Sequence, residues 1–316
     1  MGAPLIQSAL HPAGIQAARI EHLWWVMFWV CSVVFVAVVV AMGIAVVRGR
    51  GAASSASEAT LARSVAIAVG LSIVALLVLL TEGELVGRGV ASLREQDPNA
   101  LRIQITGNQW WWDVQYLNPN PSLIVTTANE IHIPVGRPVG IVLRSNDVIH
   151  SLWIPALHGK RDLIPGRVTE IWLEADRAGF YRGQCAEFCG LQHAKMALGV
   201  VADLPDDFER WLTQMRSPAP APTTPSQTRG KDVVERGPCA MCHTVVGTLA
   251  GGRTAPDLTH IASRSSIGAG SLPNTRGNLG GWIVDPQHVK PGNHMPAPGL
   301  SSEEVQPLLD YLETLK

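Results

Sequence analysis

Residues 185–196 of the chain read C-A-E-F-C-G-L-Q-H-A-K-M. Two cysteines, a histidine and a methionine therefore lie close together, at Cys185, Cys189, His193 and Met196. Thiolate, imidazole and thioether groups form a soft ligand set that favours copper over magnesium or calcium. The cysteine spacing, on a loop between predicted strands, lets both sulfurs face one point and bridge two metals. A disulfide or a zinc site is the competing interpretation, although zinc rarely takes thioether ligands.

The residues on both sides of this stretch predict a β-domain over 92–216. Apolar residues alternate with others along 131–135 and 139–143, the period of two that is typical of strands. Further predicted strands are L-R-I-Q-I-T, T-E-I-W-L-E and M-A-L-G-V-V-A. Several short strands separated by turn residues indicate a β-sandwich or barrel, which a helix over 206–215 closes.

Two long apolar runs precede the β-domain, over 23–47 and 64–80. Each is close to the length that a membrane-spanning helix needs, and Trp24, Trp25 and Trp29 stand where aromatic side chains favour the lipid–water interface. Only 16% of the residues are charged, against about 25% in ordinary soluble domains. A pair of buried core helices is the alternative, but the runs lack charges. We therefore predict a transmembrane hairpin over 23–91.

The loop of this hairpin carries Arg48, Arg50 and Arg63 against Glu58. Short loops rich in arginine stay in the cytoplasm, so both hairpin ends face outward and everything after Thr81 is extracytoplasmic. Residues 1–22 are predicted to be extracytoplasmic as well, and they lack the pattern of an intact signal peptide. The net charge of −1 and the absence of a basic block argue against nucleic acid as a partner.

The segment 217–228 is rich in proline and uncharged, which predicts an extended linker. The module that follows, 229–316, contains C-A-M-C-H at Cys239–His243. C-x-x-C-H is the attachment signal for c-type haem, in which both thiols bond the porphyrin and the histidine binds iron. A zinc knuckle or a thioredoxin-like site is the alternative. Ser301 or Ser302 is expected to cap a final helix.

The second iron ligand is expected after His243, and Met295 is the methionine in that part of the sequence. Methionine is the usual partner of histidine in cytochromes c because it raises the reduction potential. His260, His288 and His294 compete for this role, and His294 is the strongest rival.

The string C-x-E-x-C-G-x-x-H-x-x-M resembles the dinuclear copper (CuA) motif of cytochrome c oxidase subunit II. D-V-I-H-S-L-W-I-P, I-P-G-R-V and G-N-Q-W-W-W-D-V-Q-Y resemble neighbouring segments of that family, and the likeness spans roughly 23–212. The last module resembles class I cytochromes c. The resemblance implies a two-helix transmembrane hairpin, a cupredoxin-like β-sandwich or barrel, and an all-α class I cytochrome c domain.

The resemblance also implies roles for single residues. Cys185 and Cys189 would bridge the coppers, and Trp110 would be the point where electrons enter. The further copper ligands would be His150, His193, Met196 and the carbonyl of Glu187, whose side chain would reach a magnesium ion bordering subunit I. The haem would be held by Cys239, Cys242, His243 and Met295.

The family's activity implies a relay of electrons from haem c through CuA to a haem in subunit I, coupled to dioxygen reduction and proton pumping. Expected partners are oxidase subunits I and III, with a cytochrome c or a bc complex as donor, in a bacterial plasma membrane. A nitric oxide reductase subunit and a simple membrane-bound electron carrier are the alternatives. Glu58 lies in the region of a proton-channel carboxylate in the family, but loop solvation explains it equally.

Overall fold

A computed structural model describes residues 5–49, 57–91 and 100–316. The chain divides into two compact units, Gln16–Glu95 and a second unit made of Met1–Ile15 with Gln96–Lys316.

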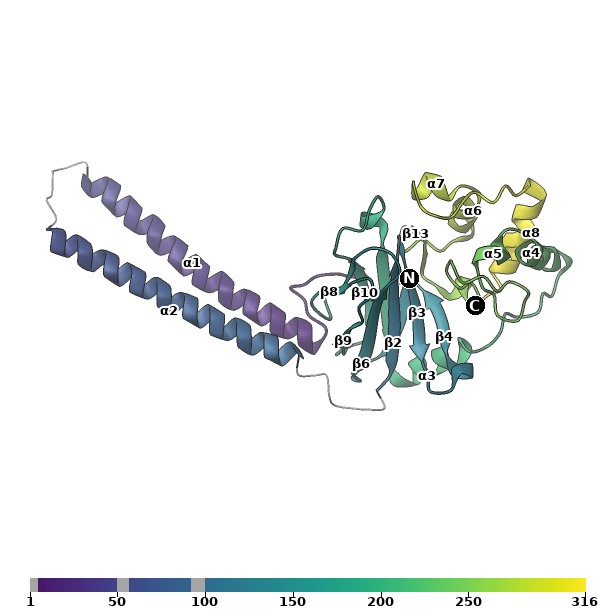
Figure 1. Ribbon diagram of the computed structural model, residues 1–316, viewed down its shortest axis with the longest axis horizontal. Coiled ribbons are helices and arrows are strands. Elements are labelled where there is room, and N and C mark those ends of the chain that lie inside the picture. The colour runs from purple at the N-terminus through teal and green to yellow at the C-terminus, as the bar shows by residue number, and fades with distance from the viewer. Residues whose placement is uncertain (1–4, 50–56, 92–99) are drawn as a thin grey trace. The chain divides into compact units, whose positions relative to one another are not determined.

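The first unit is a helical hairpin of α1 (Ile15–Gly49) and α2 (Glu58–Ala91), which run antiparallel (Figure 1). Both helices are long and apolar enough to cross a membrane, as predicted. The helices extend beyond the predicted apolar runs, because residues such as Ala17 and Ala18 favour helix and continue it outward from the apolar core. Residues 50–56 of the arginine-containing loop and the predicted boundary at residue 92 lie outside the described residues.

The second unit contains a β-sandwich of two sheets (Figure 1). One sheet has the order β4-β3-β2-β6-β9, and the other has the order β5-β11-β10-β7-β8 with β1 paired to β10. The strands of the first sheet are β2 (Arg102–Asn108), β3 (Trp111–Leu117), β4 (Val125–Ala128), β6 (Val139–Ser145) and β9 (Thr169–Leu173). Those of the second are β1 (Leu5–Ile6), β5 (Glu130–Pro134), β7 (His150–Trp153), β8 (Arg161–Leu163), β10 (Gly179–Cys185) and β11 (Ala197–Asp203).

The core of the sandwich follows the alternation that the sequence predicted. Ile131, Ile133 and Ile141 are fully buried, and the five strands predicted over these and the other apolar segments are confirmed. The last two residues of the W-W-W stretch begin β3, in which Trp112 is buried and Trp111 is half-buried. Helix α3 (Pro205–Gln214) closes the domain one residue earlier than predicted.

The haem-motif module is mainly helical and has its own buried core. Its elements are α4 (Pro225–Arg236), α5 (Cys239–Cys242), β12 (Ser266–Ile267), β13 (Leu272–Pro273), α6 (Arg276–Val284), α7 (Pro286–Val289) and α8 (Ser302–Leu312). Helix α4 crosses α8 at Gly230, where a Cβ atom would lie 1.9 Å from the carbonyl oxygen of Pro307. Only glycine permits this close crossing. Ser301 caps α8, as one of the two predicted alternatives.

The predicted linker differs from the structure over 225–228, which form the first turn of α4. Thr224 caps this helix in a reciprocal capping box with Gln227, and Pro225 occupies the first turn, where its missing N–H costs nothing. Further upstream, the Ala219 N–H donates to the carbonyl of Val246 at 2.8 Å. Residues 225–228 are therefore part of the haem-motif module, and Ala219 is bound to it as well.

Candidate metal centre and haem-binding motif

Three of the predicted copper ligands lie at the ends of neighbouring strands. Cys185 ends β10, Met196 directly precedes β11, and His150 begins β7, while His193 lies on a short 3-10 turn. Strand β10 pairs with both β7 and β11. The hydrogen bonds of one sheet therefore fix three of these side chains relative to one another.

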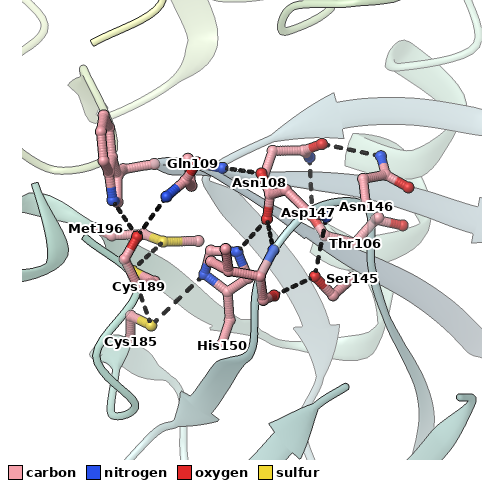
Figure 2. Close-up of polar contacts among 12 residues, drawn as sticks. Thr106, Asn108, Gln109, Ser145, Asn146, Asp147, His150, Cys185, Cys189 and Met196 are labelled. Atoms are coloured by element: carbon pink, nitrogen blue, oxygen red, sulfur yellow. Dashed lines mark hydrogen bonds and ion pairs between the residues drawn. The ribbon is translucent and has the colours of Figure 1, made fainter. Parts of the chain in front are cut away.

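The side chains of His150, Cys185, Cys189 and Met196 converge on a compact donor cluster (Figure 2). The two cysteine sulfurs lie 3.8 Å apart, and Cys185 Sγ lies 3.8 Å from His150 Nδ1. Cys189 Sγ lies 3.6 Å from His193 Nδ1 and 3.9 Å from Met196 Sδ. The carbonyl oxygen of Glu187 lies 3.2 Å from Cys185 Sγ, whereas the Glu187 side chain is exposed.

The donor cluster is buried, so a charge on one of its side chains is unfavourable unless an opposite charge balances it. His150, Cys185, Cys189 and Met196 are each no more than 4% exposed. The contact with Cys189 lowers the pKa of Cys185 to about 3, and the contact with Cys185 together with burial raises the pKa of Cys189. Without a cation the pair therefore keeps one proton. A soft cation that replaces this proton suits two thiolates, two imidazoles and a thioether, so the residues fit copper.

Asp147, three residues before His150, contacts this candidate ligand, and the sequence reasoning did not single it out. Its Oδ1 lies 2.7 Å from His150 Nε2 and accepts from the Val148 N–H at 2.7 Å. Its Oδ2 accepts from the Gln109 N–H at 2.6 Å. Burial raises the pKa of Asp147, but these hydrogen bonds outweigh it and the pKa is lowered. With Nε2 bound to this carboxylate, the Nδ1 of His150 faces the sulfurs.

Trp110 reaches the cluster through the backbone of Cys189. The indole Nε1 donates to the Cys189 carbonyl at 2.8 Å, and Gln109 Nε2 donates to the same oxygen at 2.7 Å. Gly190 has a φ of +111°. A Cβ atom there would lie 3.0 Å from both the Trp110 ring and Gln109 Nε2. Glycine therefore lets the indole lie directly against the ligand loop.

The C-A-M-C-H motif forms a short helix with half-buried cysteines, and His243 follows it. His243 Nδ1 lies 2.6 Å from the carbonyl oxygen of Pro256, to which it donates. Burial lowers the pKa of His243, so the neutral ring is favoured. A neutral imidazole whose Nδ1–H is bound to a carbonyl presents its Nε2 lone pair to a metal.

Two further residues of the module fit a haem beside this motif. Gly252 packs so tightly on the motif that a Cβ atom would lie 2.5 Å from backbone carbon of Cys242. Arg264 is only 7% exposed, and its guanidinium donates to the Asp257 carbonyl at 2.5 Å. Within the described part of the chain its Nε has no hydrogen-bond partner. A buried guanidinium with an unused donor suits an anionic group, such as the carboxylates of a haem.

Met295 lies half-buried on a loop whose backbone is well fixed. Its N–H donates to Asn293 Oδ1 at 2.8 Å, and its carbonyl accepts from Gln287 Nε2 at 3.0 Å. Among the rival histidines, both ring nitrogens of His260 lie near backbone carbonyls, those of Lys316 and Ser217. The role of Met295 as an iron ligand stays a prediction.

Comparisons with known proteins agree with both parts of this second unit. Residues 117–203 match the family described as cytochrome c oxidase subunit II, periplasmic domain. Residues 227–316 match the cytochrome c family. The sandwich and the haem-motif module thus define a copper-binding electron-transfer protein fused to a cytochrome c.

Curated relatives extend this likeness over most of the chain. Cytochrome c oxidase subunit 2 of Alkalihalophilus pseudofirmus is 39% identical over 246 residues, which cover 76% of this chain and 70% of the relative. Cytochrome c oxidase subunit 2 of Bacillus sp. strain PS3 is 33% identical over 258 residues, covering 78% and 71%. The chain belongs to the cytochrome c oxidase subunit 2 family, in a form with a fused cytochrome c domain. The two domain matches imply copper and haem c as its cofactors.

Proposed function

We propose that this chain is the subunit through which electrons enter a proton-pumping terminal oxidase, passing from haem c to a dinuclear CuA centre and on to a haem in subunit I. The observation that carries the proposal is the position of Trp110. Its indole donates to the carbonyl of Cys189, and its ring centroid lies 5.6 Å from that of His294 in the haem-motif module. His294 is adjacent to Met295, so one aromatic side chain spans the two candidate cofactor sites.

Cys185 and Cys189 would bridge two coppers, and His150 and His193 would each bind one of them. Met196 Sδ and the Glu187 carbonyl would complete the set. When bound, the coppers and the haem take up and release single electrons without bond making at the protein.

The protein's part in this chemistry is to hold the ligands still. Strands β7, β10 and β11 carry His150, Cys185 and Met196 in one hydrogen-bonded sheet, and packed strands resist displacement of their ends. Asp147 orients the His150 ring, as outer carboxylates do for metal-bound histidines. Burial of the sulfurs excludes water from the donor cluster.

The haem would be bonded by Cys239 and Cys242, with His243 and Met295 as iron ligands. The exposed side chain of Glu187 is free to reach a magnesium ion at the border with subunit I. Subunits I and III would be the partners, and a cytochrome c or a bc complex would be the donor. The two long apolar helices support a place in a bacterial plasma membrane with both cofactor domains outside the cytoplasm.

The proposal is tested by time-resolved reduction of the purified oxidase complex. A soluble photo-excited ruthenium complex delivers one electron to haem c, and the absorbance of haem c and CuA is followed. We expect reoxidation of haem c to coincide with reduction of CuA. Haem c that stays reduced while CuA stays oxidised would contradict a relay between them.

A further inference from the structure

The haem-motif module contacts the β-sandwich through a set of hydrogen bonds that surround the donor cluster. From the sandwich, Gln192 Nε2 donates to the Pro291 carbonyl and Lys195 Nζ donates to the Val289 carbonyl, both at 2.5 Å. The Ala197 N–H donates to the Ala269 carbonyl at 3.0 Å. These three sandwich residues lie within or directly after the copper motif. A further contact lies at Glu130, whose carboxylate accepts from the Ser265 N–H of the module at 3.1 Å. The metal-ligand loop is therefore one part of the contact between module and sandwich.

One side chain of the module is buried at this contact. Lys290, at the end of α7, is 3% exposed, and its Nζ donates to the Trp110 carbonyl at 2.6 Å and to the Gly268 carbonyl at 3.2 Å. One acceptor belongs to the sandwich and the other to the module itself. Within the described residues, none of the ion pairs includes Lys290.

Burial of the Lys290 amine at this contact costs hydration free energy. Burying an amine without an opposite charge loses hydration that two carbonyl dipoles restore only in part. Burial accordingly lowers the pKa of Lys290 to about 7. Separated from the sandwich, the same amine would lose one of its two carbonyl partners. The hydrogen bond to Trp110 therefore exists only in the docked arrangement, whereas the one to Gly268 lies within the module.

The position of Lys290 connects it to the relay. It binds the backbone carbonyl of Trp110, the residue whose indole contacts Cys189. It also begins the loop that leads to His294 and Met295, and Asn293 Nδ2 ties that loop back to the Lys290 carbonyl at 2.7 Å. A shift of Lys290 would therefore move the His294 ring away from the Trp110 ring.

We propose that Lys290 is a positioning residue that latches the haem module onto the copper domain at Trp110, so that electrons cross within a docked assembly. The inference rests on the proposed function, because it assigns the contact used by the same relay. Without the latch the module remains tethered, but it must find Trp110 by a diffusive search at the effective concentration that its tether sets.

The test compares Lys290→Leu with Lys160→Leu, an exposed lysine of the sandwich, in the full oxidase complex. Haem c is reduced by the photo-excited ruthenium complex, and its reoxidation by CuA is timed in buffers of increasing glycerol content. For the wild type and Lys160→Leu we expect a rate that does not depend on viscosity. For Lys290→Leu we expect a rate lower by about tenfold or more that falls further with viscosity, as a tethered search requires.

Loss of docking is distinguished from loss of a cofactor by the haem c spectrum and the copper electron paramagnetic resonance signal, which should not change. If Lys290→Leu does not load both cofactors, Lys290→Gln, which keeps an amide donor, is measured in its place. A variant with the wild-type rate, or a slower one without viscosity dependence, would overturn the latch. Absence of transfer in the wild type would instead overturn the proposed function itself.

Discussion

The rings of His294 and Trp110 lie with their centroids 5.6 Å apart and their planes at 46°. The two residues come from different modules, and Trp110 is only 6% exposed. A soluble donor therefore does not reach Trp110 while the haem module is docked. Under the proposed function, this contact would make the fused haem, rather than an external cytochrome, the immediate electron source for the copper domain.

Replacing Trp110 with Phe removes the indole N–H that donates to the Cys189 carbonyl. We expect transfer from haem c to CuA to slow by roughly tenfold, equivalent to about 1.4 kcal/mol of activation free energy. Flash reduction of haem c measures this rate. Trp111→Phe is the matched control, because the Trp111 side chain is half-buried and lies on the face of β3 opposite to the buried Trp112. Equal rates in the two variants would remove Trp110 from the path.

Replacing Asp147 with Asn keeps the shape of the side chain but removes the charge beside His150 Nε2. Loss of such an outer partner typically lowers metal affinity by about 10- to 100-fold, and we expect copper binding to weaken by that factor. Competition with a copper chelator measures it. The exposed Asp176→Asn variant should bind copper like the wild type. Unchanged affinity in Asp147→Asn would mean that the carboxylate does not support the ligand.

Replacing Met295 with Leu tests the predicted iron ligand. Methionine ligation raises the haem potential, so its loss should lower the midpoint potential by on the order of 100 mV and change the spin state. A redox titration followed by haem absorbance checks both effects. His294→Gln should keep a low-spin haem. The reverse pattern, with the change in His294→Gln alone, would identify His294 as the ligand.

His132 predicts a pH dependence of stability in the sandwich. Its Nδ1 lies 2.6 Å from Asp203 Oδ2, and its Nε2 lies 3.7 Å from Glu130 Oε1. Burial lowers the pKa of His132, but the hydrogen bond to Asp203 and the charges of both carboxylates outweigh it and the pKa is raised. A raised folded-state pKa gives stability that is fully present below about pH 6.5 and lost as pH rises through the raised value.

His132→Gln should therefore lower the unfolding temperature Tm by several degrees at pH 6 and by less at pH 9, for a loss of about 1–3 kcal/mol. Thermal scans at both pH values measure the difference. His11→Gln, at an exposed position, is the control. An equal loss at both pH values would show that packing of the ring on Trp211, and not its charge, stabilises the domain.

Ending the chain after residue 218 removes the haem module and leaves the sandwich intact. Copper should still bind, because its candidate ligands all lie upstream. Electron uptake should fall by roughly a hundredfold at low donor concentration, since a tethered encounter becomes a diffusive one. Steady-state turnover with a soluble cytochrome c measures the effect. Turnover equal to that of the full chain would contradict the relay through the fused module.

The parts of this molecule that sequence reasoning predicted are those encoded locally. The copper motif is a single loop between β10 and β11, the haem motif is one helical turn, and each spanning helix is one continuous apolar run. His150 lies far from that loop in sequence, and it was assigned by resemblance rather than by pattern. The start of α4 was also encoded locally, in T-P-S-Q, but the surrounding prolines obscured the capping box.

The parts that sequence reasoning missed depend on contacts between distant segments. Asp147 is recognisable only when β7 brings His150 against Cys185. Lys290 stands in K-P-G-N-H, where a lysine ordinarily predicts a solvated turn, and its burial depends on the Trp110 carbonyl 180 residues away. Neither Asp147 nor Lys290 belongs to a sequence motif that would predict its contact.

According to the proposed function, one chain holds a dinuclear copper site and a c-type haem. The most direct test is the copper and iron content of the full-length chain, purified in detergent from a host that attaches haem, together with its electron paramagnetic resonance spectrum. We predict two coppers that share one unpaired electron and one low-spin haem per chain. One iron without copper, or a copper signal from a single nucleus, would contradict the claim.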